Sequence, residues 1–577
     1  MVSNGYFLPD AWTTEFEARQ IPGCQHPYEE FVGEIEISPN DQNQYRLLRL
    51  SNNMVVVCVQ DTDTKQASAS VIVNIGASSD PPEILGLAHF LEHMLLKGSK
   101  KYPEENDYKK YVYGNAGSCN ASTYPYCTKY FFTVDNSALE GGLDRLSRFF
   151  IDPLMDPDCV DRELKAVESE FRSKLQDDGK RSFVIFKSAS SQSHSFSKFS
   201  TGNNQTLRES TLSRGLDIRQ EMLDFYKRFY SADLMKLIIV GNHSLDQMTE
   251  WAVSMFSDVQ SKGDTNIIEP SHPFGREQLG KALCYEPVGE KNSISLAFAL
   301  PETKQFYKVN PYRYVSSLLS RADKGSLLSY LQKQGLATSV SAYVYDWSYD
   351  RFNVFKVFVS ATPSGIKRRN EVVQAVFAYI KMLTATGPQQ QYYNEIKVIS
   401  DSNYRVFKKR KASDMRAFIE NGIHNSYIRP GHIVYKGSPL GDFDPRLIAQ
   451  LLEQLTPTNY LLVVQSKHHE DVECDKREKF YDIKYNISGL PVGMTSEMDI
   501  PDSLVDNFYM PSPNSYLPEN LDVEKPKDPS QVIVADEPTL LTKTDLMEVW
   551  FKRDDRFFVP QGSIKLSFDM PEIINSP

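Results

Sequence analysis

The segment His89-Phe90-Leu91-Glu92-His93 brings together three side chains that could do chemistry as a group. Two histidines four residues apart on a helix lie about 40° from each other around its axis, so both imidazole rings can reach one metal ion. Glu92 lies close to the same face, where its carboxylate could take a proton from a water molecule that the metal activates. The spacing therefore predicts a metal-dependent hydrolytic site on one helix.

A tetrahedral zinc site that keeps an open position for water needs a third protein ligand. The acidic segment 161–170 offers Glu163 and Glu170, which are seven residues apart and share one face of a helix. The alternative is structural, because histidine pairs at this spacing are commonly core or surface coincidences and acidic helices are commonly solvated faces. The apolar surroundings of the histidine pair favour the metal site, since ionisable groups there are costly to bury unless they are coordinated or paired.

Hydrophobic periodicity predicts the elements that must position these residues. The helix that carries the histidines is expected to open at 80–83, where two prolines replace N–H donors that a first turn leaves unpaired, and to stop at Gly98. In the first half of the chain we expect strands at 55–59, 67–73, 130–134 and 237–240, and helices at 84–97, 139–150, 161–175, 217–229 and 245–256. The second half repeats this outline, with strands at 293–298, 354–359 and 461–464 and a helix at 311–331. We therefore predict a duplicated domain of α+β layers, with helices on one face of each sheet.

The composition is that of a globular protein, since 41% of the 577 residues are hydrophobic and 24% are charged. Lys and Arg number 64 against 75 Asp and Glu, and the net charge of −11 argues against nucleic acid or anionic lipid as the main partner. No apolar run approaches the ~20 residues of a membrane-spanning helix, and the N-terminus resembles neither a secretory signal nor a mitochondrial presequence. The seven cysteines lack CxxC spacing, which favours reduced thiols and a cytoplasmic location.

Several segments together resemble the inverzincin peptidases of the insulinase (pitrilysin) family. The motif helix carries the resemblance most strongly, and the separation from His93 to Glu170 matches the place of that family's third zinc ligand. The segments that agree are 86–95, 97–103, 117–123, 194–203, 229–232 and 550–558. The resemblance covers nearly the whole chain from about residue 30.

The resemblance implies a fold and a metal site. The fold would be two homologous domains, each with helices packed on a mixed, mainly antiparallel β-sheet, as in the LuxS/MPP-like metallohydrolases. His89, His93 and Glu170 would hold one Zn2+ per chain, and Glu92 would be the general base. Glu163 would not bind the metal itself but would orient one of the histidines that does.

The resemblance also implies a substrate and a reaction. An edge strand would bind the peptide as an added strand, and its residues would be Asn120, Ala121, Ser122 and Thr123. The implied function is a zinc metalloendopeptidase that cleaves short unfolded peptides, with pheromone-precursor processing as one candidate role. A non-catalytic scaffold or partner subunit of the same fold, and a peptide-binding module that uses the edge strand alone, stay open as alternatives.

The expected organisation has five parts. They are an N-terminal extension (1–30), a catalytic zinc-binding domain (31–268), a second homologous domain without a zinc site (269–490), a proline-rich linker (491–542) and the start of a third domain (543–577). Residues 550–568 are predicted to form two strands, which cannot bury a core, so residues after about 545 are expected to make only local contacts. Members of the family are about twice as long as this chain. We therefore expect the chain to bind zinc but to be weakly active without a C-terminal half-chain, with a second copy of the chain as a further candidate partner.

Overall fold

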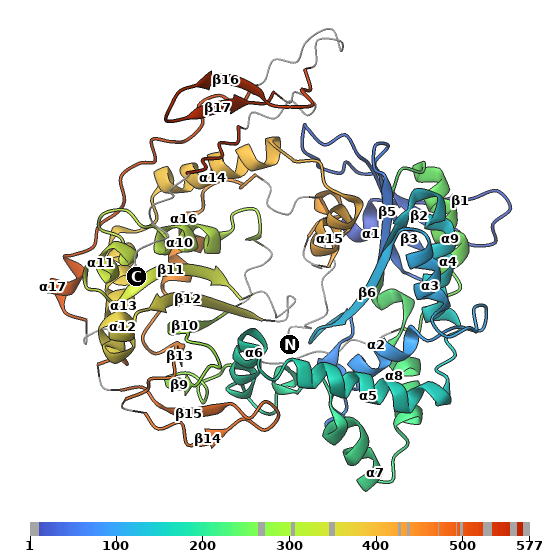
Figure 1. Ribbon diagram of the computed structural model, residues 1–577, viewed down its shortest axis with the longest axis horizontal. Coiled ribbons are helices and arrows are strands. Elements are labelled where there is room, and N and C mark those ends of the chain that lie inside the picture. The colour runs from blue at the N-terminus through green and yellow to red at the C-terminus, as the bar shows by residue number, and fades with distance from the viewer. Residues whose placement is uncertain are drawn as a thin grey trace.

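The structure is a computed structural model that describes residues 11–263, 272–301, 306–345, 352–424, 428–434, 439–470, 472–491, 493–496, 500–522, 533–553 and 562–568. Two lobes lie side by side, each built on one large β-sheet, and the first half of the chain forms most of one lobe while the second half forms most of the other (Figure 1). A separate two-stranded hairpin lies at the periphery.

The first lobe contains an eight-stranded sheet with the order β1-β2-β3-β4-β8-β5-β7-β6. Neighbouring strands are antiparallel, except that β4 and β8 are parallel. β6 ends the sheet, and among the described strands it pairs with β7 alone, so no strand covers its outer edge. The strands are β1 (Phe16–Gln20), β2 (Pro27–Phe31), β3 (Gln44–Leu50), β4 (Val55–Gln60), β5 (Gln66–Val73), β6 (Ser118–Thr123), β7 (Thr128–Asp135) and β8 (Met235–Gly241).

Burial on both faces of this sheet explains its continuous apolar runs. In β4, Val56 and Cys58 face one hydrophobic cluster, whereas Val57 and Val59 face another on the opposite side of the sheet. β8 divides in the same way, with Ile239 on the first face and Ile238 on the second. A strand that is covered on both faces does not alternate between apolar and polar residues.

Helices cover the first of these faces and supply the larger core of the lobe. They are α2 (Leu87–Leu95), α3 (Asp107–Gly114), α4 (Leu139–Ile151), α5 (Pro157–Ser173), α8 (Ile218–Phe229) and α9 (Leu245–Phe256). α1 (Ala11–Thr14) and α7 (Ser210–Ser213) are single turns. The layered arrangement that the sequence predicts is therefore confirmed.

The second lobe repeats the strand arrangement of the first. Its seven-stranded sheet has the order β11-β12-β10-β13-β9-β15-β14, and the parallel pair β13 and β9 takes the place of β8 and β4. β11 ends this sheet as β6 ends the other. The strands are β9 (Lys281–Tyr285), β10 (Ser293–Leu300), β11 (Ala337–Val344), β12 (Asn353–Ala361), β13 (Tyr460–Gln465), β14 (Lys476–Arg477) and β15 (Lys484–Gly489). This common order supports the predicted duplication.

The helices of the second lobe pack on one face of its sheet, again around one core. The predicted single helix 311–331 is wrong, because the chain breaks after Leu319 and a new helix begins after Ser326, whose hydroxyl accepts from the N–H of Ser329. Gly325 allows the break with its left-handed backbone, and a side chain there would meet the ring of Tyr509. The helices are α10 (Pro311–Leu319), α11 (Leu327–Lys333), α12 (Pro363–Lys367), α13 (Arg369–Thr386), α14 (Gln390–Arg405), α16 (Pro445–Leu452) and α17 (Asp502–Val505). Among the described residues, no helix combines the length and the apolar character needed to cross a membrane.

Each half of the chain also places one helix on the other half's sheet. α15 (Ala412–Ile423) covers the second face of the first sheet, where Met415 and Ile419 join the cluster around Val57. α6 (Asp178–Ser188) contributes Ile185 and Phe186 to a cluster against the second sheet. α15 stands against β5 in Figure 1. The two lobes are therefore joined by hydrophobic packing rather than by a linker alone.

The peripheral hairpin consists of β16 (Thr539–Lys543) and β17 (Glu548–Phe551), and every residue of both strands is exposed. A turn joins them, in which the backbone N–H of Thr544 donates to the carbonyl of Met547. The prediction of two strands within 550–568 is wrong in part, because β17 ends at Phe551 and pairs with a strand that precedes it. Residues 562–568 form no strand, and residues 554–561 lie outside the described part.

Candidate metal centre

α2 begins at Leu87, and not at 80–83 as the sequence predicts, because Gly86 takes a left-handed conformation with φ +92°. A Cβ atom at this position would lie 2.2 Å from the Cα of Gly202, so the two glycines let a distant loop pass against the start of the helix. The Asp80 carboxylate accepts from the N–H groups of Gly86 (2.7 Å) and Ala88 (2.8 Å). The segment 80–86 is therefore a turn that caps the helix and fixes its first residues.

The structure brings His89, His93 and Glu170 together. Their ligand atoms all lie within 4.8 Å of one another, and no other group of three such side chains comes as close in the described part of the chain. Glu170 Oε2 lies 3.6 Å from Nε2 of each histidine. α2 supplies the histidines and α5 supplies the carboxylate, so the packing of these two helices forms the group.

Each histidine is held by its other ring nitrogen. His89 Nδ1 donates to the carbonyl oxygen of Thr201 at 2.6 Å, and His93 Nδ1 donates to Glu163 Oε2 at 3.2 Å. A carbonyl or carboxylate oxygen can only accept, so both rings carry their proton on Nδ1 and turn Nε2 toward Glu170. This is how metal-binding histidines are commonly oriented.

The charges around the histidines come from three carboxylates and one amine. Glu163 also receives Lys97 Nζ at 2.7 Å, so both of its oxygens are engaged. Burial alone would lower the pKa of His93, but hydrogen bonds to Glu163 and Glu170 raise that pKa to about 9. Hydrogen bonds from both histidines hold the pKa of Glu170 well below its usual range. The carboxylates of Glu163 and Glu170 therefore stabilise positive charge beside them, as a site for a cation requires.

Glu92 lies in the same cavity but outside the group of three. Its side chain is buried, and burial raises the pKa of its carboxyl group. Thr123, the last residue of the edge strand β6, donates its hydroxyl to Glu92 Oε2 at 2.6 Å. Glu92 is therefore positioned by one oxygen while the other stays available for a proton.

The site opens into a cavity of about 450 Å3. One side of the cavity is the edge strand β6, from which all four predicted residues contribute: Asn120, Ala121, Ser122 and Thr123. The three candidate ligands, Glu92 and Glu163 also line the cavity. The free edge of a sheet thus runs past the candidate metal site, which is the arrangement needed to present an extended peptide to it.

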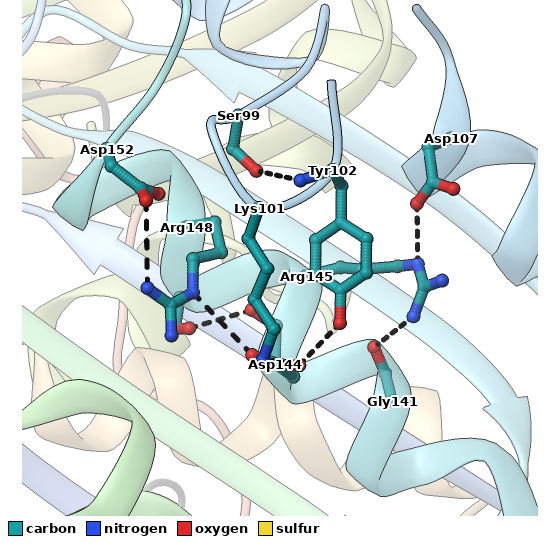
Figure 2. Close-up of polar contacts among 10 residues, drawn as sticks. Ser99, Lys101, Tyr102, Asp107, Gly141, Asp144, Arg145, Arg148 and Asp152 are labelled. Carbon is teal, nitrogen blue, oxygen red and sulfur yellow. Dashed lines mark hydrogen bonds and ion pairs between the residues drawn. The ribbon is translucent and has the colours of Figure 1, made fainter. Parts of the chain in front are cut away.

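The loop that follows α2 is fastened to α4, which fixes the end of the motif helix (Figure 2). Asp144 accepts from Lys101 Nζ and from the hydroxyl of Tyr102, both at 2.5 Å. Arg145 lies against the ring of Tyr102 and donates to Asp107 at 2.7 Å. This network limits the movement of the segment that carries Lys97, the residue that pairs with Glu163.

Sequence reasoning missed three contacts of the site. Thr201 holds His89 through its backbone carbonyl, and a carbonyl leaves no signal in a sequence. Lys97 pairs with Glu163, and Thr123 holds Glu92 in addition to belonging to the predicted edge strand. The HxxEH spacing predicts that a base is present but not which hydroxyl orients it.

A His-x-x-Glu-His helix joined to a carboxylate from a second helix defines an inverzincin-type site, here on a duplicated sheet-and-helix fold. Models of peptidase-family domains agree with this class. "Insulinase (Peptidase family M16)" matches residues 55–189, "Peptidase M16 inactive domain" matches 217–399, and the middle or third domain of peptidase M16 matches 404–577. The chain belongs to the insulinase family, peptidase family M16.

Two relatives and one solved structure define the extent of the similarity. The A-factor-processing enzyme of Saccharomyces cerevisiae is 35% identical over 540 residues, which are 93% of this chain and 52% of that protein. The insulin-degrading enzyme of Homo sapiens is 33% identical over 560 residues, which are 96% of this chain and 54% of that protein. The crystal structure of pitrilysin superposes with a TM-score of 0.82 at 27% identity and covers 92% of this chain and 55% of its own. The chain spans about half the length of these relatives.

Proposed function

We propose that this chain carries the active site of a zinc metalloendopeptidase that cleaves short, extended peptides. The observation that carries the proposal is the group of His89, His93 and Glu170 beside the cavity and its edge strand. Two imidazoles and one carboxylate are a common ligand set of catalytic zinc, which keeps its fourth position for water or substrate. We propose one Zn2+ per chain, because no second group of this kind occurs among the residues described.

β6 is proposed to bind the substrate as an additional strand. No described strand covers its outer edge, where the N–H of Ala121 donates only to the neighbouring Asn120 Oδ1 at 3.0 Å, and all four residues 120–123 line the cavity. Binding through main-chain hydrogen bonds requires an extended segment and depends little on its side chains. This mode favours unfolded peptides over folded domains.

Glu92 is proposed to act as the general base. A bound zinc ion would supply Lewis-acid activation of a water molecule and of the scissile carbonyl group. Glu92 would accept the proton of the attacking water on the oxygen that Thr123 does not hold, and would return that proton to the leaving amine. Its pKa, which burial raises, suits both steps. Glu163 would keep the ring of His93 in the orientation that presents Nε2.

The natural substrate, the partners and the location are also matters of proposal. The names of the two relatives suggest a-factor precursors and insulin as candidate substrates to test, and the first agrees with the pheromone-precursor role that the sequence suggested. Because the chain spans about half the length of those proteins, we propose that a C-terminal half-chain completes the substrate chamber. The seven free cysteines support a cytoplasmic location, which cell fractionation would test.

Zinc content and peptide cleavage, measured together, test the function. Glu92→Gln should keep about one zinc per chain but lose cleavage of a fluorogenic peptide, because Glu92 is assigned to proton transfer and not to the metal. His93→Gln should lose the zinc. Cleavage by Glu92→Gln at the wild-type rate would contradict the assignment. Wild-type protein without tightly bound zinc would favour a non-catalytic scaffold of the same fold.

A further inference from the structure

A second cavity, of about 380 Å3, lies where the two lobes meet. The end of α6 and the segment 197–200 form one wall, and the β14–β15 hairpin forms the other. Four cationic side chains and a single carboxylate line it: Lys187, Lys198, Arg477, Lys479 and Glu478. This excess of positive charge contrasts with the net charge of −11 of the whole chain.

The one carboxylate of the cavity is already engaged. Glu478 Oε2 accepts from the backbone N–H groups of Phe480 (3.0 Å) and Tyr481 (2.6 Å). Arg477 is paired with Asp482 at 2.7 Å. The ammonium group of Lys479, however, forms no ion pair with any described carboxylate and only lies over the ring of Phe480. Of the two cations that this wall contributes to the cavity, Lys479 is therefore the one without an ion-pair partner among the described residues.

Lys187 is the most informative of these cations because only 4% of it is exposed. Its ammonium group donates to the carbonyl oxygen of Lys198 at 2.5 Å, and the rings of Phe183 and Phe196 lie near it. No described carboxylate lies within ion-pair distance of it, and burial lowers its pKa to about 7, with Asp80 opposing this shift from farther away. A buried ammonium group is costly unless an anion compensates it.

The two walls of the cavity contact each other across the lobes. Phe199 from the first lobe and Phe480 from the second stack at 4.0 Å with an angle of 11° between their planes. Lys198 Nζ donates to the carbonyl oxygens of Ser78 (2.8 Å) and Asp80 (2.6 Å). Lys187 and Lys198 are thus held in place before any ligand arrives, which favours binding because less order must be imposed.

We propose that this cavity binds an anionic group, a phosphate or a carboxylate, through Lys187 and Lys479. The anion has two possible sources. It is either a small free anion or an acidic group on a peptide that occupies the metal cavity. The second source is geometrically reasonable because Ser200 lines both cavities and α6 runs along both, with Lys180 and Phe183 facing the first cavity. Only this second source rests on the proposed peptidase function.

The first experiment titrates the full chain with inorganic phosphate and follows binding by calorimetry. Wild type and Lys333→Gln, an exposed lysine that lines neither cavity, should bind equally. Lys187→Met should bind at least tenfold more weakly and Lys479→Gln at least threefold more weakly. Lys479 is exposed, so Lys479→Gln should fold normally. This variant tests whether the cavity binds the anion if Lys187→Met does not fold. A loss of binding in Lys180→Gln instead would place the anion in the metal cavity and overturn the proposal.

The second experiment measures how tightly two peptides bind to the Glu92→Gln protein, which should not cleave them. The two peptides differ only by one Glu-to-Gln change. A preference for the acidic peptide that disappears in Lys479→Gln but not in Lys333→Gln supports the peptide as the source. If neither peptide binds, the result counts against the proposed function. The phosphate titration alone then decides whether the cavity binds an anion. If phosphate does not bind and no acidic preference depends on Lys187 or Lys479, the proposal is wrong.

Discussion

Replacing Glu163 with Gln should weaken zinc binding about tenfold without removing a ligand. The carboxylate of Glu163 accepts from His93 Nδ1 at 3.2 Å through one oxygen and from Lys97 Nζ at 2.7 Å through the other. An amide has one accepting oxygen, so its NH2 group must face one of these two donors. Either His93 loses the partner that orients its ring, or Lys97 is left without its nearest carboxylate.

The size of the effect follows from the geometry. A hydrogen bond to a charged group contributes about 1.5–3 kcal/mol, and loss of such support behind a metal ligand commonly costs about 10–100-fold in affinity. The contact between His93 and Glu163 is longer than the ~2.8 Å of a strong charge-assisted bond. The lower end of the range, about tenfold, is therefore expected.

Competition with a zinc chelator of known affinity measures the dissociation constant directly, and it needs no peptide cleavage. Glu168→Gln is the matched control, because Glu168 lies on the same helix α5, is similarly buried and binds Arg172 and the backbone of Asn204 instead of a histidine. Its zinc affinity should equal that of the wild type. A Glu163→Gln protein within twofold of wild type, or an equal loss in Glu168→Gln, would refute the reasoning.

Three further predictions concern the base, the stability and the missing partner. Thr123→Val should retain zinc but lower kcat/KM about tenfold, since its hydroxyl is the hydrogen-bond donor to Glu92; Thr338→Val, at an exposed position of β11 outside the cavity, is the control, and an unchanged kcat/KM in Thr123→Val would contradict the role. Burial lowers the pKa of Lys356 to about 7 from 10.5, so between these values the unfolded chain binds the extra proton and wild-type stability should rise with pH. Lys356→Met should lack this rise, which amounts to about 3 kcal/mol between pH 7 and pH 9.5. The difference in Tm between Lys356→Met and wild type should therefore be largest at pH 7 and shrink toward pH 9.5. A difference in Tm that stays constant would argue against a buried charge. Addition of a C-terminal half-chain should raise peptide cleavage by at least about tenfold, because each transition-state donor commonly contributes about 10²–10³ in rate, and a rate that does not change would exclude the need for a partner.

Local pattern was sufficient to predict the elements whose residues pack in a regular way. The helix expected at 245–256 is α9 with the same bounds, because its apolar residues recur with helical spacing and Ser244 caps it. The run 55–59 became β4, which is buried on both faces. The HxxEH spacing likewise placed two histidines on one face of a helix, since that depends on helical geometry alone.

Contacts between distant segments could not be predicted in this way. Gly86 meets Gly202 only because two loops converge in the folded lobe, and this contact moves the start of α2 to Leu87. The predicted helix 311–331 ends at Leu319, and Gly325 lies in the break, where the ring of Tyr509 from a distant segment leaves no room for a side chain. α6 lies on the second sheet and α15 lies on the first. These positions depend on how the two lobes pack, which no local periodicity encodes.

The central claim is that His89, His93 and Glu170 hold one zinc ion, and X-ray absorption at the zinc edge of the zinc-loaded chain tests it most directly. Two imidazole nitrogens are expected at about 2.0–2.1 Å and carboxylate or water oxygens at about 2.0–2.2 Å, and His93→Gln should hold no zinc under the same loading. A spectrum with sulfur at about 2.3 Å, or one that His93→Gln leaves unchanged, would contradict the claim.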